Sequence, residues 1–460
     1  MVDSSYDLVV IGAGPGGYVA ALRAAELGMR VACVDKQWLG GTCLNVGCIP
    51  SKALLESSSQ YQMAISTYPD HGISFSGVAL DLQAMMARKK KVVGTMTKGI
   101  ASLFKKHNVE FFSGSGSIPR SGCVLVSDGE QSYKLVTERI LIATGSAPIE
   151  LESLPFDGQR IISSTEALEM SEPPPRLVVI GAGAIGLEMG SIWARLGSDV
   201  LVVEFTDTIL PDADREIATR LKSVLGRQGI KFELCTAAER AELGDTEVRL
   251  TIVRSDDQRQ VVACDRVLVA VGRQPFHSGV GLANLGVAVD RRDFVTVNEN
   301  YETTVKGIFA IGDAICGPML AHKAESEGAV AVERMAGIFG SVNYDAIPNV
   351  VYTHPELASV GKTEEQLIAA GVNFKVGKHP FRANARAHCI DATEGLVKVL
   401  VEAESDRILG IHILGSDASH LIAEGVLAME FGASAEDIAR TVHAHPTLAE
   451  VVREAAAEVA

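Results

Sequence analysis

The chain contains 460 residues, with 42 lysines and arginines against 57 aspartates and glutamates, which gives a formal net charge of −15. Apolar residues make up 47% and charged residues 22%, a balance typical of globular chains with several domains. The acidic excess argues against nonspecific binding to nucleic acid. The most apolar long window, residues 177–194, contains Glu188 and several glycines, so we expect no membrane span.

The N-terminus carries no basic, apolar or Arg/Ser-rich leader before its first apolar run. We therefore expect a cytoplasmic location. A mature organellar form, already stripped of a transit peptide, stays open as the alternative.

The chain opens with a strand, a glycine loop, a helix and a second strand. Residues 7–11 form a continuous apolar run, as expected for a strand buried on both faces. The loop places glycines at 12, 14, 16 and 17, and a helix is expected over 18–27, ending at Gly28. Residues 30–35 read as the second strand, which ends on Asp35.

The same pattern returns later in the chain. An apolar run at 177–180 leads into a loop with glycines at 181, 183 and 186, then a helix to 197 and a strand ending on Glu204. The spacing from first glycine to acid is 35 − 12 = 23 positions in the first copy and 204 − 181 = 23 in the second.

This pattern suits a dinucleotide. The first glycine makes a tight turn, the second lets the backbone approach the pyrophosphate, and the third lets the helix pack closely on the strand. The helix N-terminus attracts the phosphates, and the acid accepts hydrogen bonds from the ribose hydroxyls. Two copies predict two dinucleotides, FAD and NAD(P). NAD is favoured at the second site, because Glu204 would repel a 2′-phosphate and the next arginine is Arg215.

Among the eight cysteines, Cys43 and Cys48 alone lie close in sequence, and no CxxC is present. Two buried thiols or a metal pair are open alternatives at this stage. Residues five apart on a regular helix rise about 7.5 Å. A disulfide needs Cα atoms roughly 4.4–6.8 Å apart, so bridging would require a distorted helical turn, which Gly47 and Pro50 permit.

The segment from Gly40 to Lys52 resembles the pyridine nucleotide–disulfide oxidoreductases, and the resemblance covers essentially the whole chain from about residue 6. It implies that Cys43 is the interchange thiol facing the substrate and that Cys48 is the thiolate facing the flavin. It also implies that Lys52 lies beside the flavin and pairs with Glu188. One departure is Asp35, which stands where the family more usually has glutamate.

Other segments match the family in order and spacing, notably Ala143–Ser146, the Gly-Asp pair at 312–313 and the turn at Gly272. The FAD site implied by the resemblance consists of Gly12, Gly14, Gly17, Asp35, Lys36, Gly41, Thr42, Lys52, Gly116, Thr144, Gly145, Ser146, Asp313, Met319, Leu320, Ala321 and His322. The implied NAD site consists of Gly181, Gly183, Ile185, Gly186, Glu188, Glu204 and Gly272.

The C-terminal segment His443-Ala-His445-Pro-Thr-Leu-Ala-Glu450 resembles the family members that oxidise dihydrolipoyl groups. It implies that His445 is the acid/base and that Glu450 orients it. A surface His-x-His or a metal pair is the plainer alternative, and we expect no metal site. The nearest rival function is an NADPH-dependent reductase of glutathione or a similar disulfide. A flavin-bound scaffold without activity is the rival from another class.

We predict an α/β chain with two Rossmann-like dinucleotide-binding domains and an α+β C-terminal dimerisation domain. The expected division is an FAD domain at 1–146, an NAD domain at 147–270, a central segment at 271–345 that rejoins the FAD domain, and an interface domain at 346–460. The resemblance implies a homodimer in which His445 serves the partner subunit. It further implies the oxidation of dihydrolipoamide by NAD⁺, with the dihydrolipoyl domain of a 2-oxoacid dehydrogenase or glycine cleavage complex as partner.

Overall fold

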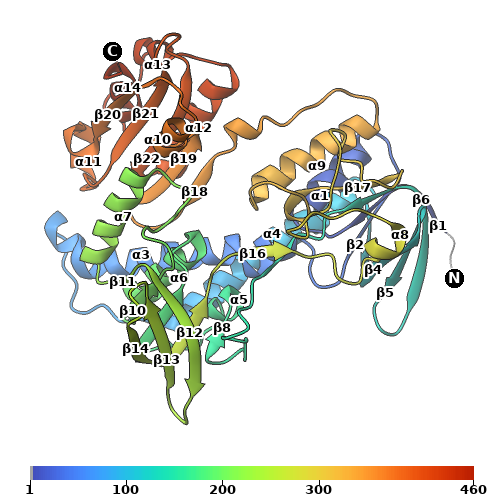
Figure 1. The fold of residues 1–460 in the computed structure, drawn as a ribbon, viewed down its shortest axis with the longest axis horizontal. Helices are drawn as coiled ribbons and strands as arrows, with labels where there is room; N and C mark the ends of the chain where they lie inside the picture. The colour runs from blue at the N-terminus through green and yellow to red at the C-terminus, as the bar shows by residue number, and fades with distance from the viewer. Residues whose placement is uncertain (1–3, 460) are drawn as a thin grey trace. The chain divides into compact units, whose positions relative to one another are not determined.

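The computed structural model describes residues 4–459 and groups them into two compact units (Figure 1). Unit 1 contains residues up to 54 together with 81–149 and 272–342. Unit 2 contains 55–80, 150–271 and the chain from 343 onward. Each unit therefore combines segments that are distant in sequence, and the four-part domain division stays a prediction.

Unit 1 is built on a seven-stranded sheet of order β3-β2-β1-β6-β5-β4, with β17 also paired to β6. Strands β1, β2, β3, β6 and β17 run parallel, whereas β4, β5 and β6 form an antiparallel meander. The bounds are β1 Ser4–Ile11, β2 Val31–Asp35, β3 Glu110–Ser113, β4 Ser115–Arg120, β5 Cys123–Ser127, β6 Ser132–Ile142 and β17 Ile308–Ala310.

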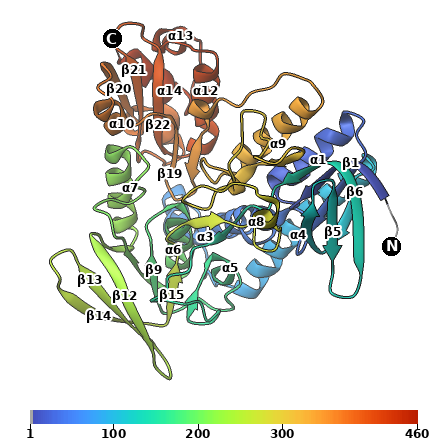
Figure 2. The ribbon, with the colours of Figure 1, turned by 45° about the vertical axis from the view of Figure 1, so that its right-hand side comes forward.

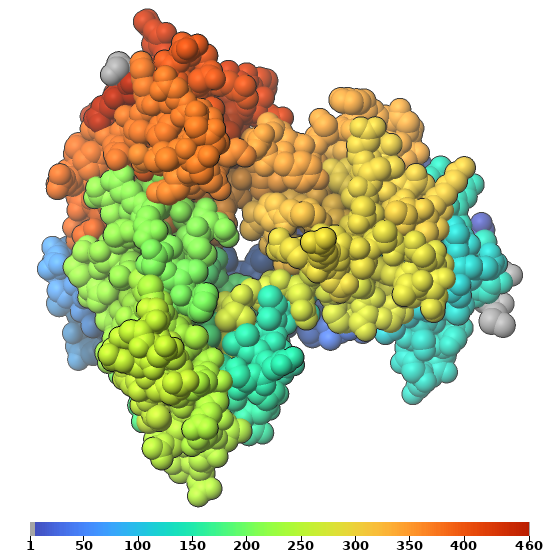
Figure 3. Space-filling model, viewed as in Figure 1, coloured from blue at the N-terminus to red at the C-terminus, as the bar shows by residue number. Residues whose placement is uncertain are grey.

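Two helices of unit 1 pack against each other, α1 (Pro15–Glu26) and α9 (Ala321–Met335), although about 300 residues separate them in sequence. The central strands are fully buried, as their unbroken apolar runs predict. In Figure 3 the segment coloured yellow, from about 272 to 320, spreads over much of the visible face of unit 1.

Unit 2 repeats the parallel arrangement in a five-stranded sheet of order β11-β10-β9-β15-β8. A separate antiparallel sheet, β12-β13-β14, lies between β11 and β15 in sequence and stands out as a ribbon in Figure 2. The bounds are β8 Ile161–Ile162, β9 Arg176–Ile180, β10 Asp199–Val203, β11 Lys231–Glu233, β12 Thr236–Leu243, β13 Val248–Arg254, β14 Arg259–Cys264 and β15 Arg266–Val269.

The two meanders join their parallel sheets differently. In unit 1 one uninterrupted strand, β6, pairs with β5 over residues 132–136 and with β1 over residues 135–142. In unit 2 the corresponding stretch breaks at Asp265 into β14 and β15. The Asp265 carboxylate accepts hydrogen bonds from the Arg176 backbone N–H at 2.8 Å and from its guanidinium at 3.0 and 3.1 Å. A polar junction therefore replaces a continuous strand.

The C-terminal part of unit 2 is an antiparallel sheet of order β18-β19-β22-β21-β20 covered by helices. Its strands β21 and β22 are followed in sequence by helix α12. The bounds are β18 Asn349–Val351, β19 Glu356–Gly361, β20 Phe374–Pro380, β21 Leu396–Glu402, β22 Ile408–Gly415, α10 Glu364–Ala369, α11 Ala385–Cys389, α12 Ala418–Glu430, α13 Ala435–Arg440 and α14 Glu450–Ala457.

The remaining helices and short strands connect these sheets. They are α2 Gly41–Val46, α3 Cys48–Ser66, α4 Leu82–Lys106, β7 Ser146–Pro148, α5 Ser164–Ala167, α6 Ala184–Arg195, α7 Arg215–Arg227, β16 Arg273–Pro275 and α8 Leu282–Leu285, with 3₁₀ turns at Tyr68–His71, Gly312–Ala314, Tyr344–Ala346 and Phe381–Ala383. Among residues 4–459, no helix is long and apolar enough to cross a membrane.

Candidate active site

The first glycine loop of unit 1 has no room for side chains at two of its positions. Gly12 has φ +107°, and a Cβ there would lie 2.1 Å from the Ala143 carbonyl oxygen. A Cβ at Gly17 would lie 1.8 Å from the Gly12 carbonyl oxygen. Helix α1 follows with Gly14 at its N-cap and no side-chain cap, so its first N–H groups are left for a ligand.

The acid at the end of β2 is tied to this loop. One Asp35 carboxylate oxygen accepts the Ala13 N–H at 2.8 Å, and the other accepts the N–H groups of Gln37 at 2.9 Å and Trp38 at 3.1 Å. Gly116 of β4 lies against the ends of the first two strands, since a Cβ there would lie 3.1 Å from Ile11 and 3.3 Å from Val34. The shorter side chain of Asp35 thus organises both the glycine loop and the loop that follows it.

The segment that carries the cysteines begins on the glycine loop. The Gly40 N–H donates to the Ala13 carbonyl at 2.8 Å. Gly41 has φ +60°, and a Cβ there would lie 2.5 Å from the Gly14 Cα. Helix α2 starts at Gly41. The predicted FAD residues Gly14 and Gly41 are therefore in backbone contact, and the residues after Gly41 are held next to the loop.

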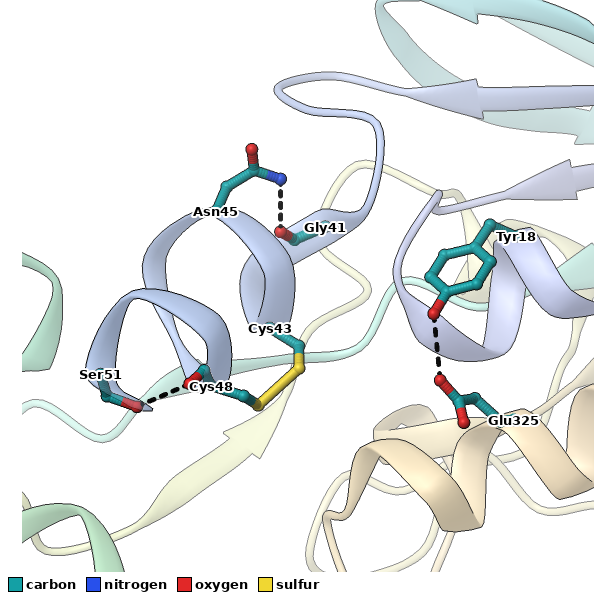
Figure 4. Close-up of a disulfide and its surroundings, with 7 residues drawn as sticks. All are labelled: Tyr18, Gly41, Cys43, Asn45, Cys48, Ser51 and Glu325. Carbon is teal, nitrogen blue, oxygen red and sulfur yellow. Dashed lines mark hydrogen bonds between the residues drawn. A yellow bond between two sulfur atoms is a disulfide. The ribbon is translucent and has the colours of Figure 1, made fainter. Parts of the chain in front are cut away.

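Cys43 and Cys48 form a disulfide with Cα atoms 4.7 Å apart (Figure 4). The expected distortion is present, because α2 ends at Val46, Gly47 interrupts the helix and α3 begins at Cys48. A Cβ at Gly47 would lie 3.2 Å from the Cys43 Cα. The Ser51 hydroxyl donates to the Cys48 carbonyl at 2.9 Å. Glycine at 47 thus allows the close approach that a regular helix forbids.

Two of the other cysteines, Cys33 and Cys264, are buried. Burial raises the pKa of the Cys264 thiol to about 12, and burial also raises the pKa of Cys33. Such thiols carry little thiolate and react slowly. Within residues 4–459, no group of three or more His, Cys, Asp or Glu side chains could hold a metal ion.

A second cluster in unit 1 joins the end of β6 to the Gly-Asp pair. The Ser146 hydroxyl donates to the Asp313 carboxylate at 2.5 Å, and Arg273 donates to the Ser146 hydroxyl at 2.7 Å and carbonyl at 2.6 Å. Burial lowers the pKa of Arg273, although the Asp313 charge opposes the shift. Arg273 was not predicted as a site residue from the sequence. The one feature that could have indicated it is its position next to Gly272.

Further predicted FAD residues lie at defined positions in unit 1. The Thr144 hydroxyl is buried without a hydrogen-bond partner, and Gly145 beside it has φ +72°. The Lys36 ammonium lies 4.2 Å from the Phe276 ring centroid. Thr42 lies in α2 and Lys52 in α3. The start of α9 carries the other predicted residues, with Met319 just before it, Leu320 at its N-cap, and Ala321 and His322 in its first turn.

Unit 2 contains the second glycine loop with matching geometry. Gly181 has φ +102°, and a Cβ there would lie 2.5 Å from the Ala270 carbonyl oxygen. A Cβ at Gly186 would lie 2.1 Å from the Gly181 carbonyl oxygen. Helix α6, which includes Ile185, starts after Gly183 without a side-chain cap. The Glu204 carboxylate accepts the Ala182 N–H at 2.7 Å and the Thr206 N–H at 2.8 Å.

Both loops therefore fit a dinucleotide, by observations on the chain itself. Each loop has glycines at positions where a Cβ would collide with backbone. Each is followed by a helix whose N-terminus is uncapped, and in each an acid is hydrogen-bonded to the loop. The buried Thr144 hydroxyl without a partner adds a polar group that a ligand would satisfy in unit 1. Gly272, with φ +128°, makes the turn before β16.

The C-terminal histidine and glutamate lie together in unit 2. His445 Nδ1 lies 2.9 Å from a Glu450 carboxylate oxygen, and the His445 side chain is 72% exposed. Hydrogen bonds from the Thr447 N–H and then from His445 lower the pKa of Glu450. Glu188 of α6 is buried and accepts the Tyr352 N–H at 3.0 Å. The pairing of Lys52 with Glu188 stays a prediction.

Comparisons with known proteins define the family. Residues 6–328 match the pyridine nucleotide-disulphide oxidoreductase family, and residues 347–456 match the dimerisation domain of that family. The chain belongs to the pyridine nucleotide-disulphide oxidoreductases, a family of flavoenzymes that use FAD and a pyridine nucleotide. The match at 347–456 supports pairing of two copies of the chain.

Relatives of similar length are known. The chain is 50% identical to the mitochondrial dihydrolipoyl dehydrogenase of Pisum sativum, over 98% of this chain and 90% of that protein. It is also 50% identical to the leghemoglobin reductase of Glycine max, over 98% of this chain and 87% of that protein. The crystal structure of LpdA from Mycobacterium tuberculosis superposes with a TM-score of 0.91 at 26% identity, covering 99% of each chain.

Proposed function

We propose that this chain is a dihydrolipoyl dehydrogenase, which oxidises dihydrolipoyl groups to lipoyl groups with NAD⁺ as acceptor. The observation that carries the proposal is the Cys43–Cys48 disulfide, held at the start of a helix that contacts the first glycine loop. The full-length similarity to a dihydrolipoyl dehydrogenase supports this substrate over other small disulfides. The partner is the dihydrolipoyl domain of a multienzyme complex, and the location is cytoplasmic.

The disulfide takes the electron pair from the substrate by exchange. One substrate thiolate attacks Cys43 Sγ, which forms a mixed disulfide and releases Cys48 as a thiolate. The second substrate thiolate then attacks the mixed disulfide, so that the lipoyl ring closes and Cys43 leaves as a thiolate. The substrate dithiol is oxidised, the enzyme disulfide is reduced, and the two substrate protons pass to a base and to solvent.

His445 is the base. Because its Nδ1 faces the Glu450 carboxylate, which accepts a hydrogen bond, Nδ1 carries the proton of the neutral ring. Nε2 then has the lone pair that removes a substrate thiol proton, which is required since only the thiolate attacks. Glu450 is a positioning residue that fixes the tautomer and stabilises the imidazolium.

The glycine loops hold the two cofactors. The loop of unit 1 would bind FAD, and Asp313, held by Ser146 and Arg273, would bind its ribityl chain. The loop of unit 2 binds NAD⁺, and Glu204 excludes a 2′-phosphate by charge. Bound FAD would supply the redox chemistry that carries the electron pair of the reduced cysteines to NAD⁺ as a hydride.

His445 serves the disulfide of the partner subunit. The supporting observation is that His445 and Glu450 lie inside the segment that matches a dimerisation domain, 347–456, while both cysteines lie outside it. A complete site then needs two chains. This arrangement explains how an exposed histidine can act in a protected site.

A subunit-mixing experiment tests the proposal. Inactive Cys43→Ser and His445→Ala chains are mixed and allowed to exchange subunits, and NADH formation from dihydrolipoamide is followed. A trans site gives each heterodimer one intact site, so about half of the activity per heterodimer should return. Loss of the base alone should cost about 10²–10⁴ in rate, so recovery is easily measured.

The outcomes separate the claims. Mass measurement first verifies that the subunits have exchanged. If no activity then returns, the trans arrangement is disproved. Wild-type protein that reduces NAD⁺ no faster with dihydrolipoamide than without it would disprove the proposed function itself. The matched control is His443→Ala, two positions before His445. The His443 imidazole lies 2.8 Å from Glu424 rather than near Glu450, so this variant should retain most of the activity.

A further inference from the structure

Helix α9 contains an ion pair that is completely buried. Lys323 Nζ lies 3.0 Å from Glu327 Oε1, one helical turn apart, and both side chains are 0% exposed. Moving two charges out of water is costly, and a pair of apolar side chains of similar size is often at least as stable. The pair therefore needs an explanation other than stability.

Both members of the pair hold the same glycine. Lys323 Nζ donates to the Gly312 carbonyl at 2.9 Å, and the Gly312 N–H donates to Glu327 Oε2 at 2.8 Å. Gly312 has φ +69°, a conformation that favours glycine. A cation on the carbonyl and an anion on the N–H fix the two peptide groups on either side of this residue, and the second of them leads directly into Asp313.

The side chain of Asp313 is held from a different direction. Its carboxylate accepts the Ser146 hydroxyl at 2.5 Å, and Arg273 holds that serine through two further hydrogen bonds. The backbone before Asp313 is thus held by α9, whereas its carboxylate is held by the turn after β6. Neither set of contacts alone would fix the position of the carboxylate.

The same helix also contacts the phosphate-binding end of α1. A Cβ at Gly328 would lie 2.5 Å from the Gly16 carbonyl oxygen, and one at Gly16 would lie 3.0 Å from the Ala324 carbonyl oxygen. The Tyr18 hydroxyl donates to Glu325 at 3.0 Å (Figure 4). Because α9 and α1 are in backbone contact, a shift of Gly312 against α9 is also a shift against the glycine loop.

We propose that the buried Lys323–Glu327 pair is a positioning device for FAD, which sets the distance between Asp313 and the glycine loop and thereby the affinity for the cofactor. The inference rests on the proposed function, because it takes unit 1 as the FAD site. Lys323 and Glu327 act through Gly312 and touch no substrate. The charges are retained because they give the Gly312 peptides directional, charge-assisted hydrogen bonds that an apolar pair cannot supply.

The test compares two double variants of the purified holoenzyme. Lys323→Met with Glu327→Leu removes both charges and both hydrogen bonds without leaving an unpaired buried charge. Lys323→Met with Glu327→Gln also removes the charges but keeps an acceptor for the Gly312 N–H. FAD dissociation is measured from the fluorescence of released flavin on dilution, and folding from circular dichroism.

The first variant should raise the FAD dissociation constant at least about tenfold, as expected for the loss of hydrogen bonds to charged groups. The second should lie between it and wild type. The matched control is Lys398→Met with Asp214→Asn in unit 2, where Lys398 Nζ lies 2.7 Å from Asp214 and both side chains are also 0% exposed. The control should leave FAD affinity within about twofold of wild type.

Each outcome decides the inference. FAD affinity unchanged in both α9 variants, or weakened equally in the unit 2 control, overturns it. If the variant with Glu327→Leu fails to fold, the variant with Glu327→Gln carries the test alone. An FAD dissociation constant equal to that of wild type would then count against the proposal. Wild-type protein that binds no FAD would refute the proposed function, which is a different result from wild-type binding that the variants leave intact.

Discussion

The two glycine loops share their geometry but differ in what surrounds them. In both, the first glycine has a positive φ, +107° at Gly12 and +102° at Gly181, and a Cβ at the first or last glycine of the loop would collide with backbone. In both, the acid also accepts the N–H of the residue between the first two glycines. In unit 1 the middle glycine, Gly14, lies against Gly41, whereas nothing lies within 4 Å of a Cβ at Gly183 in unit 2. In both units the segment after the second strand bonds to the loop, since the Gly40 N–H donates to the Ala13 carbonyl at 2.8 Å and the Leu210 N–H donates to the Ala182 carbonyl at 3.0 Å. The difference lies at the middle glycine, which is in contact with the chain in unit 1 and faces free space in unit 2.

This difference matches two kinds of cofactor use. A cofactor that stays bound through many turnovers can be enclosed by its own chain, and the enclosing segment in unit 1 is the one that carries the disulfide. A nucleotide that arrives and leaves in every turnover needs an open loop. The repeated motif therefore indicates that a dinucleotide binds to each unit, and the space beside the middle glycine fits a retained cofactor in unit 1 and an exchanging one in unit 2.

The largest expected effect comes from the last glycine of each loop, Gly17 and Gly186. In Gly17→Ala and Gly186→Ala the new Cβ would lie 1.8 and 2.1 Å from a carbonyl oxygen, which should destabilise the affected unit by about 3 kcal/mol. The chain has two tryptophans, Trp38 in unit 1 and the buried Trp193 in unit 2. Thermal unfolding followed in Trp193→Phe and Trp38→Phe backgrounds reports each unit separately. If the thermal unfolding midpoint of an alanine variant equals that of its parent, the close approach of backbone to this glycine is contradicted.

A smaller effect is expected from substitutions of the two acids. A change at Glu204 should alter the preference between NAD⁺ and NADP⁺, whereas a change at Asp35 should alter FAD affinity. Glu204→Ala with Phe205→Arg removes the charge that repels a 2′-phosphate and adds a cation at a residue that is 77% exposed. The NADP⁺ to NAD⁺ ratio of kcat/KM should rise by about 30-fold, or about 2 kcal/mol. Asp35→Ala is the matched control, since it should weaken FAD and leave that ratio alone. An unchanged ratio in the Glu204→Ala, Phe205→Arg variant would show that Glu204 does not contact the ribose.

The smallest effect is expected at the middle glycine. Neither Gly14 nor Gly183 has positive φ, and a Cβ at either meets nothing closer than 4.0 Å, so alanine should leave the unfolding temperature nearly unchanged. The methyl group would still crowd the pyrophosphate. Gly14→Ala should weaken FAD about tenfold, or about 1.4 kcal/mol, and Gly183→Ala should weaken NADH by a similar factor. Equal loss of both cofactors in either variant would show that the two loops are not independent.

Much of this organisation could be predicted from local sequence. The strand, glycine loop and helix of each half follow from apolar runs, glycine spacing and a terminal acid, all within about 30 residues of one another. The interrupted helix at Gly47 followed from the spacing of Cys43 and Cys48. Positions confirmed in this way depend on short-range geometry.

What the sequence did not reveal depends on contacts between distant segments. Arg273 bonds to Ser146, 127 positions away, and Tyr18 bonds to Glu325, 307 positions away. Lys323 and Glu327 are close in sequence, but a pair at this spacing reads as an ordinary exposed helix pair. Their burial becomes visible once α9 packs on α1, which no local pattern predicts.

The continuous strand β6 and its broken counterpart have a consequence for local opening, as amide hydrogen exchange would record it. In unit 1, separating the meander exposes amides of the same strand that pairs with β1, so the meander and the parallel sheet belong to one cooperative unit. In unit 2, the break at Asp265 separates the backbone pairing of β12, β13 and β14 from the pairing of β15 with β9, so the two sheets are joined by side-chain packing. Protection in unit 2 should therefore fall in two steps, whereas unit 1 exchanges its meander and its sheet together.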